Sequence, residues 1–186
     1  MRPERDAELE HEVYENESFR GEDLSGIRTT HCTFRACDFT LAQLNASEHV
    51  GTDFVNSIFE AANLFGAAFA ECRLVGATFA GATLTGLAVD GGDWSYALLR
   101  GQDLTGSELQ RLRLREADLS EANLTNADLR GADLTRARLH NAILAGADLR
   151  ETIVDGVDLA AARVAEARLD LAGAVQLARS LGAVFD

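Results

Sequence analysis

The chain has 186 residues and a formal net charge of −13, and all 17 of its basic residues are arginine. This acidity argues against nucleic acid or an anionic membrane as a direct partner, and no stretch approaches the 18 uninterrupted apolar residues that indicate a transmembrane helix. The acidic start, MRPERDAELEHEVYENE, lacks the apolar region of a signal peptide, so we expect a cytoplasmic protein.

The first predicted element is an acidic N-terminal segment, residues 1–16, that caps the repeat following it. Leu9 and Tyr14 continue the five-residue register of that repeat weakly. We therefore expect residues from about 9 onward to wrap the first coil, and residues 1–8 to be disordered.

Residues 17–170 form the second element, a five-residue repeat that is most regular in ADLSEANLTNADLRGADLT, residues 117–135. A period of five fits neither a helix nor a strand. From Phe19 to Leu169 the central position recurs 31 times without insertion or deletion, and it is Leu, Phe, Val or Trp everywhere except Thr29 and His49. The position two before the centre is Ala fifteen times and otherwise mostly small.

Two inward rows and a recurrent corner describe a polygonal coil whose turns must stack to bury their inner faces. Thirteen of the sixteen glycines lie two residues after the centre, where a missing Cβ favours a corner. The volumes of the two rows compensate, as at Gly92 with Trp94, whereas the pair Leu112 and Leu114 is uncompensated and predicts a local bulge. The repeat sets the length of each side at five residues, but it does not set the number of sides in a coil.

These residues resemble the pentapeptide-repeat family, whose pattern is A(D/N)LXX, over residues 17–171. The resemblance implies an all-β fold, a right-handed quadrilateral parallel β-helix with about twenty residues per coil. Two features of the sequence agree with a period of twenty. Thr29 and His49 would be stacked neighbours, and large side chains would form ladders in a core that includes Phe19, Phe39, Phe59, Phe79, Trp94 and Leu124.

The last element, residues 171–186, has helical spacing, with Asp170 as a candidate N-cap and Gly182 as a terminator. A helix of about twelve residues is marginal alone, so its apolar face needs a partner. That partner is the last coil or a second molecule; family resemblance favours a homodimer through Leu171, Ala174, Val175, Ala178 and Leu181.

No motif in the chain predicts catalysis, a metal or a cofactor, and we expect a protein that is not an enzyme. Cys32, Cys37 and Cys72 occupy the small inward row, where a free cysteine behaves as a small hydrophobe. His49 is also inward and needs a hydrogen-bond partner, for which Thr29 is one candidate. Carboxylates are abundant but lie on convex walls, whereas acid–base catalysis needs a cleft that excludes water.

The acidic residues suggest a binding surface. One side of the coil carries an acidic residue in nearly every turn: Glu48, Glu71, Asp90, Glu108, Asp128, Asp148, Glu151 and Asp170. The alternative is that these residues have no binding role, because the surface of any rod in water must be polar and Asp is favourable at a corner.

Within the family, the chain most resembles the Mfp-type fluoroquinolone-resistance proteins of actinobacteria, through THCTFRACDFTLAQLNASEH, FVNSIFEAANLFGAAFAECRLVGATF and RLDLAGAVQLARSLG. It lacks the projecting loops of the Qnr type. The resemblance implies a dimeric rod that mimics duplex DNA, binds DNA gyrase, a type II topoisomerase, and inhibits supercoiling. Binding would involve carboxylates near the dimer junction: Asp118, Asp128, Asp133, Asp148, Glu151 and Asp158. The alternatives are a scaffold for another basic partner and an immunity factor against another topoisomerase poison.

Overall fold

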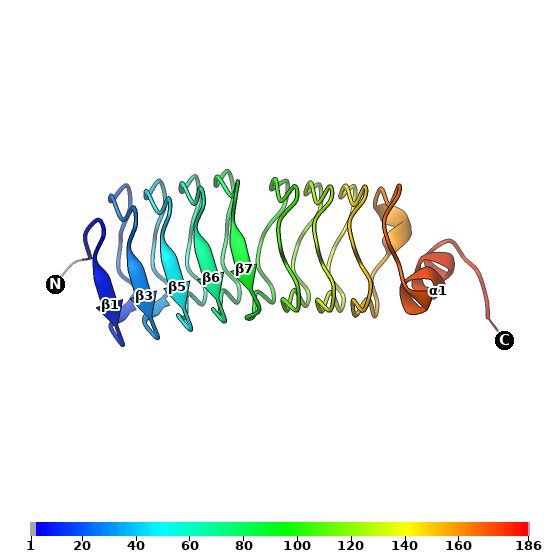
Figure 1. Cartoon of the computed structure of the whole chain (residues 1–186), viewed down its shortest axis with the longest axis horizontal. Helices are drawn as coiled ribbons and strands as arrows, with labels where there is room; N and C mark the ends of the chain where they lie inside the picture. The colour runs from blue at the N-terminus through cyan, green and yellow to red at the C-terminus, as the bar shows by residue number, and fades with distance from the viewer. Residues whose placement is uncertain (1–2, 186) are drawn as a thin grey trace.

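The protein forms an elongated rod in a computed structural model that describes residues 3–185 (Figure 1). The chain coils around the long axis of the rod, and residues twenty apart lie side by side in parallel register. From Glu8 to Arg168 this pairing runs through eight successive steps: 8, 28, 48, 68, 88, 108, 128, 148 and 168. Five residues per side and twenty per coil give four sides, so the predicted quadrilateral parallel β-solenoid is confirmed.

Short strands cover part of two sides of the rod. A five-stranded parallel sheet has the order β1-β3-β5-β6-β7, and a second sheet pairs β2 with β4. The strands are β1 (Glu8–Glu10), β2 (Val13–Glu15), β3 (Arg28–Thr30), β4 (Thr33–Arg35), β5 (Glu48–Val50), β6 (Ala68–Ala70) and β7 (Ala88–Asp90). Beyond β7 the same parallel pairing continues one residue pair at a time.

Each corner of the coil is a residue in the left-handed backbone conformation. Every fifth residue from 6 to 166 has a positive φ of about 50–72°, with residue 161 as the exception. Thirteen of these corners are glycine, which adopts this conformation without steric cost, and the others are mostly Asn, Glu, Ala, Arg or His. The predicted corner row is therefore confirmed.

The interior consists of the two inward rows, and the predicted core residues are all buried. Phe19, Phe39, Phe59 and Phe79 stack with ring centroids 5.0–5.2 Å apart, and Trp94 continues the stack 5.4 Å from Phe79. A second ladder runs through Tyr14, Phe34 and Phe54. Leu124 is fully buried further along the rod. Identical rings lie above one another because the register of twenty repeats without interruption.

At Gly92 a close approach to the backbone of the preceding coil requires glycine, and Trp94 beside it is buried. A Cβ atom at Gly92 would lie 2.3 Å from the carbonyl oxygen of Cys72, so no other residue fits there. The bulge predicted at Leu112 and Leu114 is wrong. Arg113, between them, keeps its regular pairing with both Asp93 and Asp133, and both leucines are buried.

The N-terminal coil begins earlier than we predicted from the sequence. The Asp6 N–H donates to the Ser25 carbonyl at 2.9 Å, and β1 already covers Glu8–Glu10. The chain therefore enters the solenoid register before residue 9. Residues 1–2 of the expected disordered segment lie outside the described residues.

At the other end a 3₁₀ turn, η1 (Leu159–Ala161), interrupts the last coil, and α1 (Leu171–Ser180) follows. The Asp170 carboxylate accepts a hydrogen bond from the Gly173 N–H at 2.9 Å, so the predicted N-cap is confirmed. Gly182 follows the helix with a φ of 91°. The helix lies across the C-terminal end of the rod (Figure 1).

His49 is buried at the centre of β5, in a polar cluster. One ring nitrogen lies 2.7 Å from the Thr29 hydroxyl, as predicted, and the other lies 3.0 Å from the Ser47 hydroxyl, which the sequence did not indicate. Burial lowers the pKa of His49 to about 3, so the ring is neutral in the folded protein.

We expect Leu124→Asp to prevent folding, because an unpaired carboxylate in a packed interior is very costly. Asn123→Asp is the matched control: it adds the same charge one residue earlier, at a position where the repeat itself carries Asp. Circular dichroism and thermal unfolding should show a folded Asn123→Asp protein and an unfolded or aggregated Leu124→Asp protein. Normal melting of both variants would contradict the inward assignment of this row.

The buried neutral His49 predicts a specific pH dependence of stability. In the unfolded chain the ring binds a proton below about pH 6.5, whereas in the folded protein it does so only near pH 3. Stability should therefore fall as pH is lowered from 6.5 toward 3, by up to about 1.4 kcal/mol per pH unit from this residue. Denaturant unfolding at pH 6.5 and 4.5 should show a smaller loss for His49→Leu; equal losses would contradict the prediction.

Candidate functional site

The negative charge of the rod is concentrated on one of its four sides. The acidic face, as we call it, consists of β1, β3, β5, β6 and β7, the residues that continue their pairing, and the corner that follows them. It carries ten carboxylates, on Glu8, Glu10, Glu48, Glu71, Asp90, Glu108, Asp128, Asp148, Glu151 and Asp170, and five arginines, Arg28, Arg111, Arg130, Arg150 and Arg168. Each of the other three sides carries a net charge of only −1 or −2 over the equivalent positions.

Many of the aspartates have a structural role that is independent of binding. The Asp before each central residue accepts a hydrogen bond from the N–H two residues further on, which fixes the corner. Asp23, Asp38, Asp118 and Asp133 do this with the N–H groups of Ser25, Thr40, Ser120 and Thr135 at 2.9–3.1 Å. The repeat thus favours Asp or Asn at this position for folding, and the charge there is not by itself evidence of a partner.

On the acidic face, Asp128 and Asp148 are bound by arginines two residues along the chain. Arg130 and Arg150 each approach the neighbouring carboxylate to 2.6 Å. The hydrogen bond from each arginine side chain lowers the pKa of the Asp carboxyl below its usual value. Both aspartates therefore stay ionised, but their charge is largely neutralised where a partner would meet it.

The six carboxylates predicted for gyrase binding are not brought together. Asp128, Asp148 and Glu151 lie on the acidic face, Asp133 lies on the adjacent side, and Asp118 and Asp158 lie on the side opposite the acidic face. Asp158 also caps η1 through the N–H of Ala160. One flat partner surface cannot contact all six, because a separation of ten residues is half a coil and places two side chains on opposite sides.

Four exposed glutamates on the acidic face are uncompensated, meaning that they form no ion pair with an arginine. Among the described residues these are Glu10, Glu71, Glu108 and Glu151. They occupy four different coils along the same side of the rod. The period of twenty residues in the sequence already assigned Glu71 and Glu108 to this side, although the predicted set of six carboxylates omitted them.

The adjacent side carries an alternating ladder of opposite charges. Asp53, Arg73, Asp93, Arg113 and Asp133 follow one another at intervals of twenty residues. Arg73 lies 3.1 Å from Asp53, and Arg113 lies 3.7 Å from Asp93. This side is close to neutral, and it borders the acidic face along one of its two edges.

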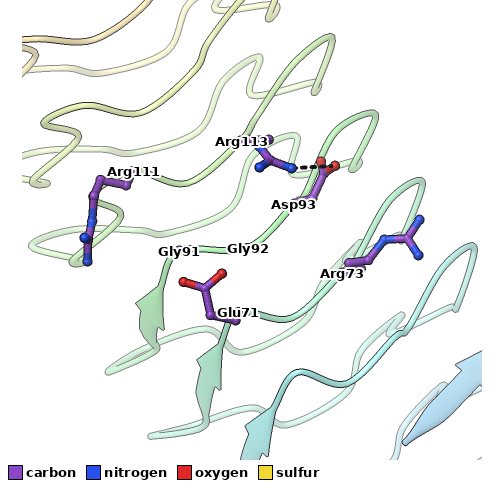
Figure 2. Close-up of a pocket in the computed structure, with 7 residues that line it drawn as sticks. All are labelled: Glu71, Arg73, Gly91, Gly92, Asp93, Arg111 and Arg113. Atoms are coloured by element: carbon purple, nitrogen blue, oxygen red, sulfur yellow. Dashed lines mark ion pairs between the residues drawn. The ribbon is translucent and has the colours of Figure 1, made fainter. Parts of the chain in front are cut away.

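A hollow of about 390 Å³ lies where this ladder meets the acidic face, and it is lined by Glu71, Arg73, Gly91, Gly92, Asp93, Arg111 and Arg113. Figure 2 shows the Glu71 carboxylate directed toward Gly91 and the Arg113 side chain directed toward Asp93. Arg111 is paired with Asp90 at 3.0 Å. Each arginine in the hollow thus has a carboxylate partner within the chain, so the hollow has no strong preference for an anion.

The cysteines lie where the sequence placed them, in the small inward row. Cys32, Cys37 and Cys72 are all buried and free, and burial raises the pKa of the Cys72 thiol to about 12. Its thiol lies 3.4 Å from the His49 carbonyl oxygen. In the part of the chain that the structure describes, no three His, Cys, Asp or Glu side chains are grouped as metal ligands would be.

At the C-terminal end, one face of α1 contacts the last coil and the opposite face is open. Gln176 donates to the Val157 carbonyl at 2.7 Å, the Leu159 N–H donates to the Ser180 hydroxyl, and Leu177 packs against the core. Of the residues predicted for a dimer interface, Leu171, Ala174 and Leu181 are exposed, and Val175 and Ala178 are half-buried. The tail adds exposed Val184 and Phe185.

The fold and this surface define a class of protein: a four-sided parallel β-solenoid of five-residue repeats with an acidic side and a helical end. A family profile described as pentapeptide repeats matches residues 62–88, 89–120 and 117–156. The chain belongs to the pentapeptide-repeat family.

Two curated relatives are similar over a limited segment. The pentapeptide repeat protein MfpA of Mycolicibacterium smegmatis is 41% identical over 54 residues, which are 29% of this chain and 28% of the relative. MfpA of Mycobacterium tuberculosis is 41% identical over 51 residues, 27% of this chain and 28% of the relative. The matched segments thus span little more than a quarter of either protein.

Solved structures extend the similarity of fold to nearly the whole chain. Full-length QnrB1, a plasmid-mediated fluoroquinolone resistance protein, superposes with a TM-score of 0.86 over 96% of this chain and 92% of that chain, at 24% identity. HetL of the cyanobacterium Nostoc, a pentapeptide-repeat protein involved in heterocyst differentiation regulation, superposes with a TM-score of 0.57. The superposition covers 88% of this chain and 87% of that chain, at 26% identity. Within residues 3–185, no helix has the length and apolar character needed to cross a bilayer.

Proposed function

We propose that this protein is a DNA mimic that binds DNA gyrase through the acidic face, competes with DNA and inhibits supercoiling, and thereby confers fluoroquinolone resistance. The observation that carries the proposal is the concentration of ten carboxylates on one side of a straight rod. The target is what the resemblance to the Mfp-type proteins implies, and the matched segment of MfpA supports that resemblance. The protein acts by binding and not by catalysis.

The spacing of the acidic face suits a groove that binds a polyanion. Residues on one row are separated by about 4.8 Å per coil, so the eight steps from Glu8 to Arg168 extend over about 38 Å. Duplex DNA carries about one phosphate charge per 1.7 Å of its axis, and the acidic face reaches a lower net density. A basic groove would nevertheless attract a rod with regularly spaced carboxylates.

The uncompensated glutamates are the residues most suited to meet arginine or lysine on the partner. Glu71, Glu108 and Glu151 need not break an internal ion pair before they bind. Asp128 and Asp148, in contrast, would first have to exchange Arg130 and Arg150 for partner residues. These differences favour the glutamates over the aspartates of the same side as the proposed contacts.

A two-fold dimer through α1 would lengthen the acidic surface. Leu171 is 81% exposed and Leu181 is 73% exposed, and a groove of about 590 Å³ lies between the helix and Ile153. Exposed apolar groups of this size are removed from water when two copies meet. The pair of rods would then present about 75 Å of acidic face, because each contributes about 38 Å.

The functional test is a gyrase supercoiling assay with two matched double variants. Glu108→Arg with Glu151→Arg reverses two uncompensated charges on the acidic face, and Glu60→Arg with Glu166→Arg makes the same change in net charge on other sides. Like-charge contacts at an interface cost several kcal/mol, so the first pair should raise the concentration for half-inhibition about tenfold or more. The second pair should change it little.

Added linear DNA should relieve inhibition by the wild-type protein, and high salt should reduce the difference between the two double variants, because exposed charges are screened beyond about 8–10 Å. Circular dichroism establishes that both variants are folded. Equal inhibition by the two would show that the acidic face is not the contact. Failure of the wild-type protein to inhibit would favour the alternative, a scaffold that binds another basic protein.

The proposed homodimer has a separate test. Leu181→Glu places a charge at the exposed C-terminal end of α1, and Ala165→Glu places the same charge at an exposed position on a side of the last coil, outside the groove. Light scattering at micromolar concentration should give a dimer for the wild-type protein and for Ala165→Glu, and a monomer for Leu181→Glu. A monomeric wild-type protein would contradict the dimer and leave α1 as a cap of the last coil.

A further inference from the structure

The stacking of coils is interrupted near the middle of the rod, far from the C-terminal interruption at η1. Between residues 81–91 of one coil and 100–110 of the next, the regular backbone hydrogen bonds are missing among the described residues. The N–H groups of Gly81, Leu84, Gly86, Gly91 and Asp103 form no backbone hydrogen bond across this boundary. One coil further on, Gly101, Leu104, Gly106, Asn123 and Asp128 all form theirs at 2.8–3.0 Å.

The interruption affects only part of the circumference. Thr83 and Asp103 are not paired, although every other neighbouring pair from Asp23 to Ile143 in this row is, and Ala88 and Glu108 still lie opposite one another. On the far side the bonds are intact: Trp94 donates to Arg113 and Tyr96 donates to Arg115, both at 2.8 Å. Figure 1 shows wider spacing between the coil that carries β7 and the next coil than between its neighbours.

Overpacking of the small inward row explains where the coils separate. From Cys32 to Thr152 this row contains Ala, Ser, Thr, Cys or Gly, except at Leu87, Gln102 and Leu112. All three exceptions lie in the two coils that meet at the interruption. A side chain too large for a close-packed interior displaces the backbone around it, and here the displacement is taken up by the missing hydrogen bonds.

The corners on either side of the opening are glycines, which leave space across it. Gly81 and Gly101 face one another across the boundary, as do Gly86 and Gly106. A Cβ atom at Gly101 or Gly106 would have no atom within 4 Å. The same is true of Gly66 and Gly81, which face regular coils, so the glycines permit the opening but do not mark it. At Gly86, which faces the preceding coil, it would lie 3.7 Å from Gly66.

We propose that this boundary is a one-sided joint at which the rod opens and closes. The opening lies on the side that carries Thr83 and Asp103, and the hinge is the intact pairing of Trp94 and Tyr96 with Arg113 and Arg115. The two halves of the rod, residues 3–81 and 111–185, move as folded units. The acidic face crosses this boundary between Ala88 and Glu108, so the joint changes the direction of one half of that face relative to the other.

The test measures access to the interior at the joint with a matched pair of cysteine variants. Ser107→Cys places a thiol in the small inward row at the joint, where Ser107 is buried. Ala127→Cys places one in the same row one coil further on, where the hydrogen bonds are intact. The native thiols of Cys32, Cys37 and Cys72 are internal references, because all three are buried in regular coils.

Under native conditions a thiol reagent should label Ser107→Cys at least ten times faster than Ala127→Cys, because local opening needs less free energy than global unfolding. Adding Gln102→Ala, which restores the usual residue of the row, should slow the labelling of Ser107→Cys toward the rate of Ala127→Cys. Equal rates for the two single variants would overturn the joint. An unchanged rate with Gln102→Ala would overturn overpacking as its cause.

Amide hydrogen exchange of the unmodified protein gives an independent measurement. The N–H groups of Leu84, Gly86 and Asp103 should exchange at least ten times faster than those of Leu104, Gly106 and Asn123, their equivalents one coil away. Equal protection would overturn the proposal without the use of any variant. Neither experiment contains gyrase, so its outcome is separate from that of the proposed function.

Discussion

The backbone hydrogen bonds between a residue and its neighbour twenty positions along the chain are the interaction on which this structure depends. A single coil of four short sides cannot bury its inner rows, so each coil is stable only when another covers it. The register of twenty aligns identical ring types in ladders, places all corners in rows and sorts the charges into sides. When this bonding fails, as between Gly81 and Gln110, the rod loses continuity on that side alone.

Acidic residues on such a rod serve either the folding of the corners or the binding of a partner, and the sequence alone does not distinguish the two roles. Asp118 and Asp133 are held by the N–H groups of Ser120 and Thr135, and they contribute to the corners whatever the protein binds. Glu108 and Glu151 contribute nothing comparable and remain free of ion pairs in the described chain. An acidic isoelectric point is therefore a weak guide to a binding surface in this fold, whereas the side on which uncompensated glutamates gather is a stronger one.

The sequence predicted the architecture well because a period of five with two inward rows fixes the environment of most residues. The stacking of Phe19, Phe39, Phe59 and Phe79, the Thr29–His49 contact and the Asp170 cap all follow from that period.

The binding surface was predicted less well. Asp118 and Asp128 are ten residues apart and so lie on opposite sides, which the period alone could have shown. The pairing of Asp128 with Arg130 depends on rotamers that no spacing specifies. The separation of coils was visible only as three oversized residues, Leu87, Gln102 and Leu112, of which only Leu112 had suggested a disturbance.

The alternating ladder beside the acidic face constrains how a rod of this kind changes length. The fold repeats every twenty residues, but the order Asp53, Arg73, Asp93, Arg113, Asp133 repeats every forty. Duplication of one coil within the ladder would preserve every hydrogen bond and every inward side chain, yet it would place two aspartates or two arginines directly above one another. Duplication of two coils would preserve the charges as well. Growth of the gene in units of two coils is thus the change that this surface accommodates without new repulsion.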